Sequence, residues 1–368
     1  MAVTPEDRRY MAAAMRLSRW HTGLTATNPS VASLVVKDGA ILGRGITAPG
    51  GRPHAETQAL AEAGEEARGA TLYVTLEPCS HHGRTPPCAD AIVAAGIARV
   101  VVGLTDPDPR VSGRGLAILR DGGIAVESGV LEEEGRRALQ AYLMRQTKGR
   151  PHVTLKLAVS ADGRIGRKGE GQVAITGPAA RAQVHVSRAE TDAILVGIGT
   201  ALADDPELTC RTPGLEARSP LRILLDRRLE LPQASKLVRS ARRVPVLAVS
   251  LPSPLVGEML RGAHLSARRA VLAAAGVEIL ETETLATLLN ALAARGISSL
   301  LVEGGAAVAR SFLAAGLVDR ILLFEGTATV GEDGLESPVV RSDMPSGFRL
   351  VRSDAFGPDH CFEYERSS

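Results

Sequence analysis

The hydrophobic pattern of this chain alternates between strand-like and helical segments, stops at residues 149–151, and then starts again. The last segment before the break, residues 131–149, is helical and highly charged. The first segment after it, HVTLKLAV from His152, has the apolar content of a buried strand. Alternating strands and helices are typical of domains in which helices cover a sheet. We therefore expect two α/β domains, residues 1–147 and 150–368.

Local patterns support this division. Residues 5–19 and residues 55–67 have the amphipathic spacing of helices. Two apolar runs joined by Asp38-Gly39 indicate a β-hairpin. In the second half, the runs DAILVG, LRILLD, VPVLAV, SSLLVEGG and DRILLFEG resemble strands and are separated by alanine-rich helical segments.

Composition excludes several classes of function. Hydrophobic residues make up 45% and charged residues 23%, as in ordinary globular proteins. The formal net charge is only +2 and aromatic residues make up 3%. A nucleic-acid base deaminase with an unrelated second domain would need a basic groove and stacking aromatic side chains, so we expect no nucleic-acid partner. No apolar stretch is long enough to span a membrane, and we expect no membrane partner.

The cysteines and the N-terminus bear on location. Four cysteines in 368 residues form no disulfide framework, and the N-terminal segment has no signal-peptide pattern. A reducing cytoplasm is the expected compartment. Cys210 and Cys361 stand alone, and we interpret them as structural.

Two other cysteines belong to a pattern that indicates a catalytic zinc site. His54 precedes a predicted helix, Cys79 follows a predicted strand, and Cys88 opens the next helix. A neutral imidazole and two thiolates leave a fourth position of Zn²⁺ open for water, as hydrolytic deamination requires. Glu56, two residues after His54, would carry protons between that water and the departing amine.

Less specific interpretations stay open at this point. A lone His-x-Glu pair is common at solvated helix starts, and the cysteines are eight residues apart rather than two. A structural zinc would want a fourth protein ligand, which His81 or His82 would supply, but Glu56 would then have no function. A non-enzymatic module with structural zinc remains the corresponding alternative for the whole chain.

The segments HAETQAL and EPCSHHGRTPPCADAI resemble the deaminase domain of the bifunctional riboflavin-biosynthesis deaminase/reductase family. NPSV at 28–31 and TDPDPRVSGRG at 105–115 resemble further segments of that family. The resemblance implies a cytidine-deaminase-like α/β/α fold with one Zn²⁺. The implied substrate is a phosphorylated pyrimidine, a diaminopyrimidinone ribosylamine 5′-phosphate, whose 2-amino group is hydrolysed. A homo-oligomer is also expected, because such deaminase folds often complete their sites across subunits.

The substrate phosphate needs cationic or N–H donors. Arg84 or Arg114, with backbone N–H groups around Gly113 and Gly115, would bind it; either arginine is otherwise a solvated surface charge. His81 and His82 would contact the base or ribose, or rigidify their loop.

Three positions differ from the residues that family members usually have. Thr47 replaces histidine, Asp108 replaces asparagine and Ala32 replaces glycine. None of the three is a predicted zinc ligand, and the first two concern details of substrate contact.

The second half resembles the reductase domain of the same family, at residues 152–163, 200–211 and 300–312. This implies a dihydrofolate-reductase-like α/β fold, NADPH as hydride donor and reduction of the ribosyl group to ribityl. The cofactor contacts that the resemblance implies are Val159, Val173, Thr200, Asp204, Gly305, Ala306, Ala307, Val308, Ala309, Arg310 and Ser311. The implied substrate contacts are Gly171, Arg188, Leu208, Arg211 and Glu303.

Residue chemistry adds to this resemblance. Glu303-Gly304-Gly305 follows an apolar strand and precedes a helix, so N–H groups there would meet a pyrophosphate, although GxGxxG is absent. Arg188 and Arg211 are suited to grip a phosphate, and Glu303 to bind ribose hydroxyls.

Three further positions each have more than one possible role. Lys156 is a substrate contact or a structural ion-pair partner. Val173 replaces a tryptophan of some relatives, which leaves stacking on the nicotinamide open. Arg227, with Arg228, would clamp the NADPH 2′-phosphate, unless both are surface charges.

Overall fold

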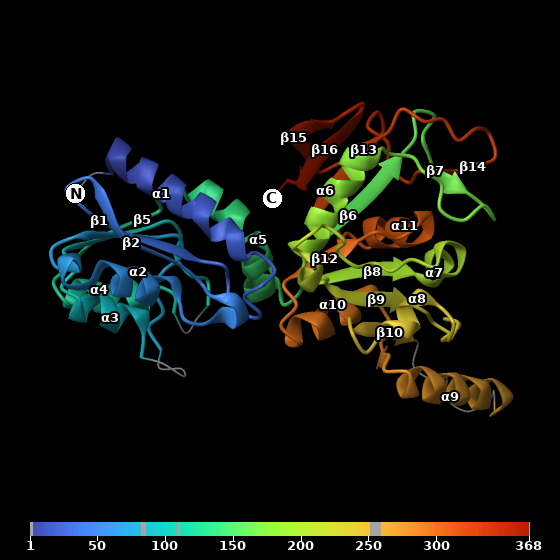
Figure 1. Cartoon of the computed structure of the whole chain (residues 1–368), viewed down its shortest axis with the longest axis horizontal. Coiled ribbons are helices and arrows are strands. Elements are labelled where there is room, and N and C mark those ends of the chain that lie inside the picture. The colour runs from blue at the N-terminus through green and yellow to red at the C-terminus, as the bar shows by residue number, and fades with distance from the viewer. Residues whose placement is uncertain (1–2, 82–85, 109–110, 251–258, 368) are drawn as a thin grey trace. The chain divides into compact units, whose positions relative to one another are not determined.

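The computed structural model describes residues 3–81, 86–108, 111–250 and 259–367, and for residues 259–263 it describes the backbone alone. The chain divides into two compact units, Met1–Arg150 and Pro151–Ser368. Each unit contains a sheet with both parallel and antiparallel strands, together with helices (Figure 1). Within the described residues, no helix is both long and apolar enough to cross a membrane.

In its described part, the first unit has a five-stranded sheet of order β2-β1-β3-β4-β5. Strand β1 pairs antiparallel with β2 and β3, whereas β3, β4 and β5 are parallel. The expected hairpin is confirmed: Asp38 and Gly39 both have positive φ between β1 and β2. The strands are β1 (Ala32–Lys37), β2 (Ala40–Ile46), β3 (Thr71–Val74), β4 (Arg99–Val102) and β5 (Ala125–Ser128).

Helices cover both faces of this sheet (Figure 1). Alternate residues of β3 and β4 face opposite cores: Tyr73 and Val101 pack with α1, while Leu72 and Val100 pack with α2, α3 and α4. The expected helix over 55–67 ends earlier, because Gly64 adopts φ 55° and a 3₁₀ turn follows. The helices are α1 (Pro5–Ser18), α2 (Ala55–Ala63), α3 (Cys88–Ala94), α4 (Arg114–Asp121) and α5 (Glu132–Lys148), with 3₁₀ turns η1 (Arg19–His21), η2 (Pro49–Gly51) and η3 (Gly64–Ala67).

A buried carboxylate attaches α1 to the sheet. Asp7 accepts hydrogen bonds from the Thr4 backbone N–H, from Tyr73 Oη at 2.9 Å, and from both terminal nitrogens of Arg99 at 2.7 and 3.0 Å. Burial alone would raise the pKa of Asp7, but the hydrogen bond from Arg99 and the other donors hold it well below its usual range. The ion pair therefore fixes α1 against β3 and β4.

Two glycines allow α2 to pack directly on β2. A Cβ at Gly43 would overlap the Ala59 carbonyl oxygen, and one at Gly45 would overlap the Ala55 carbonyl oxygen. The Gln58 side-chain amide donates to the carbonyl oxygens of Ile46 and His54, which ties the first turn of α2 to the end of β2. The position of His54 is thus set by backbone contact with β2.

Within the described residues, the second unit is built on a nine-stranded sheet of order β11-β10-β9-β8-β12-β6-β13-β16-β15. The strands from β11 to β13 are parallel to their neighbours, and β16 and β15 complete the sheet antiparallel. A separate pair joins β7 to β14. The strands are β6 (His152–Val159), β7 (Arg164–Arg167), β8 (Ala193–Gly197), β9 (Leu221–Leu225), β10 (Val246–Ser250), β11 (Glu278–Glu281), β12 (Ser299–Val302), β13 (Arg320–Glu325), β14 (Gly334–Glu336), β15 (Phe348–Phe356) and β16 (Asp359–Arg366).

The helices of the second unit also cover both faces. Helices α10 and α11 share one core with odd-numbered β6 residues such as Leu155, whereas α6 packs on the other face, near Ala158 and Phe324. Helices α7, α8 and α9 cover β8, β9 and β10 on that second face. The helices are α6 (Pro178–Ala189), α7 (Ile198–Asp204), α8 (Lys236–Arg239), α9 (Met259–Ala274), α10 (Leu285–Ala294) and α11 (Ala306–Ala314), with the 3₁₀ turn η4 (Glu216–Arg218).

The contact between β2 and α2 yields the first prediction. Gly45→Ala forces the new methyl group into the Ala55 carbonyl and displaces the start of α2, at a cost of about 1–3 kcal/mol. We expect bound zinc and any zinc-dependent activity to fall about tenfold, measured by metal analysis and rate assay. Ile41→Ala, at a half-exposed position of the same strand, is the control and should leave both unchanged. Normal zinc content in Gly45→Ala would contradict the argument.

Candidate active sites

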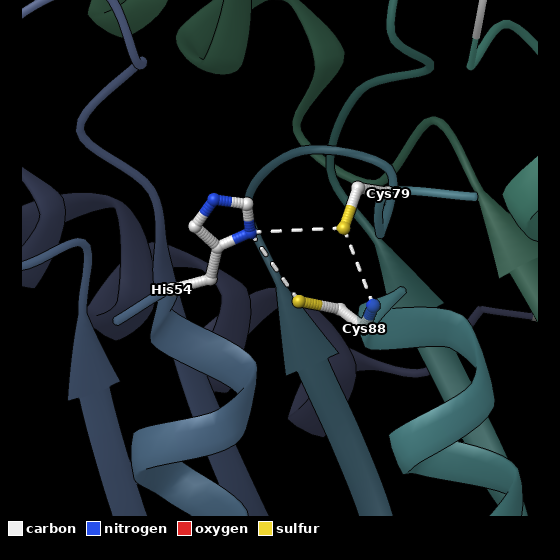
Figure 2. Close-up of side chains that lie close together, drawn as sticks. All are labelled: His54, Cys79 and Cys88. Atoms are coloured by element: carbon white, nitrogen blue, oxygen red, sulfur yellow. Dashed lines mark hydrogen bonds between the residues drawn. The ribbon is translucent and has the colours of Figure 1, made fainter. Parts of the chain in front are cut away.

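Three side chains of the first unit converge from separate elements (Figure 2). His54 is the N-cap of α2, Cys79 follows β3, and Cys88 is the first residue of α3. The Nδ1 atom of His54 lies 3.7 Å from Cys79 Sγ and 3.4 Å from Cys88 Sγ. All three ligand atoms lie within 4.8 Å of one another.

This spacing fits a tetrahedral zinc ion. Zn–N and Zn–S bonds of about 2.1 and 2.3 Å at tetrahedral angles separate nitrogen and sulfur by roughly 3.6 Å. Both observed distances to His54 Nδ1 are close to that value. His54 Nε2 is buried and has no hydrogen-bond partner in the described part of the chain. Nδ1 is therefore the nitrogen positioned to bind metal.

The two cysteines shift each other's pKa in opposite directions. Hydrogen bonding to Cys88 lowers the pKa of Cys79 to about 4, and the Cys88 backbone N–H donates to Cys79 Sγ at 3.2 Å. The hydrogen bond to Cys79, together with burial, raises the pKa of Cys88. Deprotonation of both sulfurs therefore needs a positive charge at this point, which a divalent metal supplies.

Glu56 lies beside this cluster without belonging to its ligand set. Its side chain is 4% exposed, and burial raises the pKa of the carboxyl to about 7. The negative charge of Cys79 acts in the same direction, while hydrogen bonding to Cys88 opposes it. A buried carboxyl whose pKa lies near neutrality suits a group that accepts and releases a proton.

A second buried carboxylate holds the segment that carries Cys79. Glu77 accepts hydrogen bonds from four backbone N–H groups, those of Asp106, Gly113, Gly115 and Leu116, at 3.0–3.4 Å. Two of these donors lie in the first turn of α4, where a negative charge is favourable. The N-terminus of α4 is thus already occupied by a side chain of the protein.

This contact corrects one sequence-based expectation. We expected the N–H groups of Gly113 and Gly115 to bind the substrate phosphate, but both donate to Glu77, so that assignment is wrong. Arg114 is exposed at the start of α4. Arg84 and His82 lie outside the described residues.

In the second unit, charged side chains gather between β6, β12 and α6. Arg188 donates from Nε and Nη2 to the two carboxylate oxygens of Glu303, each at 2.8 Å. Burial alone would raise the pKa of Glu303, but the charge and hydrogen bonds of Arg188 lower it. Burial lowers the pKa of Lys156, whose Nζ lies 5.7 Å from the centre of the Phe324 ring. The cluster holds two cationic groups for one carboxylate.

The pairing of Arg188 separates two arginines to which the sequence assigned the same role. Arg188 is largely buried and bound to Glu303, with Nη1 donating to the Thr209 carbonyl oxygen. Arg211 is exposed and contacts only the exposed Glu207 carboxylate, at 3.3 Å, among the ion pairs of the described residues. Arg211 is therefore the guanidinium available to an external phosphate.

The predicted cofactor contacts gather at one edge of the sheet. Val159, Thr200, Arg227 and Gly305 lie at or just beyond the carboxyl ends of β6, β8, β9 and β12, which are neighbours in the sheet. Ligands of parallel α/β sheets bind at such an edge. The Gly305 N–H donates to Thr200 Oγ1 at 3.2 Å, which joins two of these connections.

Comparisons with known proteins cover both units. The family model "Cytidine and deoxycytidylate deaminase zinc-binding region" matches residues 4–104, and the model "RibD C-terminal domain" matches residues 151–362. The chain is 41% identical to the riboflavin biosynthesis protein RibD of Aquifex aeolicus, over 89% of this chain and 88% of that protein. It is 38% identical to RibD of Escherichia coli, over 97% and 98% of the two chains.

This chain belongs to the RibD family of riboflavin biosynthesis proteins.

Solved RibD structures agree. A structure of Acinetobacter baumannii RibD superposes with a TM-score of 0.86 at 35% identity, covering 99% of both chains. A diaminohydroxyphosphoribosylaminopyrimidine deaminase/5-amino-6-(5-phosphoribosylamino)uracil reductase from Thermotoga maritima gives 0.83 at 35% identity, covering 98% of this chain and 99% of that one. The predicted family and the two-part deaminase and reductase fold are confirmed, as is the zinc-binding character of the first part.

RibD proteins combine a deaminase domain and a reductase domain, and this chain is such a bifunctional enzyme. Not every residue that the resemblance implied is equally placed to act. Ala309 is fully buried in the core, and its N–H donates to the Gly305 carbonyl oxygen, so it offers no group to a cofactor. The other predicted contacts on α11 are at least partly exposed: Ala306, Ala307, Val308, Arg310 and Ser311. Three earlier predicted contacts are also partly exposed: Gly171, Val173 and Asp204. Leu208 is buried and has a φ of 56°.

Sequence reasoning assigned no role to several buried polar residues around the RibD sites. Asp106 accepts hydrogen bonds from Tyr142 Oη at 3.0 and 3.1 Å and from the Asp108 N–H at 2.9 Å. At one of the positions that differ from the family, the Thr47 hydroxyl oxygen accepts from the Val31 N–H at 3.0 Å. The Tyr142–Asp106 and Val31–Thr47 contacts join residues 36 and 16 positions apart, so no local sequence pattern indicates them.

The Asp106 carboxyl predicts a pH dependence. Burial raises its pKa from 3.8 to about 6, so the folded state keeps a proton that the unfolded chain loses. Stability from this group is present at low pH and lost as pH rises through about 6. The free energy of unfolding of Asp106→Asn, measured relative to that of the parent, should therefore rise by about 2 kcal/mol from pH 4 to pH 7. Trp20, the single tryptophan, lies in the first unit and reports its unfolding by fluorescence. A pH-independent difference would contradict this pKa.

Proposed function

We propose that the chain catalyses two successive reactions on one phosphorylated pyrimidine. The deaminase domain, residues 1–147 within the first unit, hydrolyses the 2-amino group of 2,5-diamino-6-ribosylamino-4(3H)-pyrimidinone 5′-phosphate with release of ammonia. The reductase domain, residues 150–368, uses NADPH and a proton to reduce the ribosyl group of 5-amino-6-(5-phosphoribosylamino)uracil to ribityl. The observation that most directly supports this proposal is the cluster of His54, Cys79 and Cys88, with the buried, non-ligating Glu56 beside it.

In the first unit, His54, Cys79 and Cys88 hold the zinc. Bound zinc supplies a Lewis acid that makes water nucleophilic near neutral pH. Glu56 takes a proton from the attacking water and gives it to the departing amine, for which a pKa near 7 is suited in both directions. Arg84, assigned from sequence alone, is the proposed phosphate contact of this unit.

In the second unit, the buried charges and the sheet edge have separate roles. Glu303 is hydrogen-bonded to Arg188 and interacts electrostatically with Lys156. It orients the hydroxyl groups of the sugar. Arg211 binds the 5′-phosphate. NADPH supplies the hydride when bound. The first turn of α11, from Ala306, binds its pyrophosphate, because the N–H groups of a helix start favour anions; the Gly305 N–H is already bonded to Thr200.

The wider setting follows from the same chemistry. The small-molecule substrates require neither nucleic acid nor a membrane as partner. We place the enzyme in the cytoplasm, where its thiols stay reduced, consistent with four free cysteines among the described residues. We propose a homo-oligomer, by analogy with deaminase folds that complete their sites across subunits.

Glu56→Gln tests the two reactions on the same protein. Gln cannot move the proton but keeps the shape of Glu56, so we expect full zinc content and loss of deamination by at least about 100-fold. Given the diaminopyrimidinone phosphate and NADPH, the variant should leave NADPH unoxidised. Given the uracil product instead, it should oxidise NADPH at the parent rate. Ammonia release and absorbance at the NADPH band measure the two steps. Unimpaired deamination would reject the role of Glu56, and no NADPH oxidation by the parent enzyme would reject the reductase assignment.

Arg227 and Arg228 allow a test of cofactor choice. Both are exposed just beyond β9, but the Arg228 carbonyl oxygen accepts a hydrogen bond from Arg268 at 3.1 Å. If Arg227 binds the 2′-phosphate, Arg227→Ala should raise the KM for NADPH about tenfold or more and leave that for NADH within twofold. Arg239→Ala, at an exposed arginine that ends α8, is the control and should change neither. Equal effects on both cofactors would contradict a 2′-phosphate contact.

A further inference from the structure

Residues 205–211, which lead to Arg211, have neither helix nor strand, and side chains from other elements hold their backbone. Arg222, buried on β9, donates from Nη1 to the Glu207 carbonyl oxygen at 3.0 Å. Arg188 donates to the Thr209 carbonyl oxygen at 3.1 Å. The Cys210 N–H donates to Ser219 Oγ at 3.1 Å. The path of this segment is therefore fixed from outside.

A further contact, made to Arg211 itself, comes from His185. This residue lies on α6, one turn before Arg188 and on the same face. Its Nδ1 accepts a hydrogen bond from the Arg211 backbone N–H at 3.3 Å, so its proton is on Nε2. Burial, followed by the charges of Arg188 and Arg211, lowers the pKa of His185. The ring is therefore held in the neutral form, which alone can accept at Nδ1.

Arg211 itself has little else to orient it. Its guanidinium pairs with Glu207, and both side chains are about half exposed. Such exposed pairs contribute only about 0–1 kcal/mol, so a phosphate can displace Glu207. The position of the Arg211 backbone consequently determines where this side chain starts and which points its guanidinium can reach.

We propose that His185 is a positioning residue of the reductase unit, which fixes the Arg211 backbone so that its guanidinium meets the substrate 5′-phosphate. The inference rests on the proposed function of Arg211 as the phosphate contact. His185 touches neither substrate nor cofactor in this role. Its effect is on the binding of the phosphorylated substrate, before the chemical step.

The test compares an isosteric acceptor with an apolar residue. His185→Asn keeps an acceptor oxygen near the position of Nδ1, whereas His185→Leu removes it. Gln183→Leu, on the same helix, is the matched control. Each variant and Arg211→Ala are assayed for NADPH oxidation with the 5-amino-6-ribosylaminouracil 5′-phosphate and with the same compound lacking phosphate. Deamination by the first unit of the same chain verifies protein quality.

We expect His185→Leu to raise the KM for the phosphorylated compound about fivefold, the size of one hydrogen bond, with kcat within twofold. His185→Asn and Gln183→Leu should stay near the parent, and His185→Leu should add little to Arg211→Ala because the two act through one contact. If Arg211→Ala weakens phosphate binding but His185→Leu does not, the inference fails while the role of Arg211 stands. If neither variant discriminates the two compounds, the phosphate assignment of Arg211 fails, and the inference fails with it.

Discussion

The Glu77 carboxylate links the parts of the deaminase site, because a negative charge inside a protein must be matched by donors. Four backbone N–H groups receive it, two of them in the first turn of α4. Cys79 is two residues further along the chain, so the same contact fixes one zinc ligand relative to α4. His54 is set independently, by the close packing of α2 on β2. Both ligand-bearing segments are thus held by contacts within the protein, which reduces the ordering that metal binding requires.

The reductase unit solves the same problem with side chains. Glu303 is matched by the fork of Arg188 and by the charge of Lys156, on the face of the sheet that α6 covers. Breaking such a pair leaves an uncompensated buried charge, so these residues hold one another in place. Backbone donors hold the first site and side-chain donors the second.

The sequence predicted what depends on residue chemistry and short spacing. His54, Glu56, Cys79 and Cys88 were found because few other functions require these residue types in this order, and the family and fold followed. Contacts between distant residues were missed. The partner of Gly113 and Gly115 is Glu77, 36 and 38 positions away, which no local pattern reveals. The resemblance implies cofactor contacts for the whole run from Gly305 to Ser311. The helical period of α11, however, turns Ala309 into the core.

The N-termini of the helices differ in what their backbone N–H groups bind. The first N–H of α3 donates to Cys79 Sγ, and those of α4 donate to Glu77, so both helices direct their positive ends at anions that belong to the protein. Helix α11 has no side-chain cap in the described structure, and Gly305 precedes it at the sheet edge where ligands bind. Helix α7 also begins at that edge, after β8, without a side-chain cap. The described helix starts of the first unit thus include two that hold the protein's own anions, whereas α7 and α11 begin without a side-chain cap where parallel sheets bind ligands.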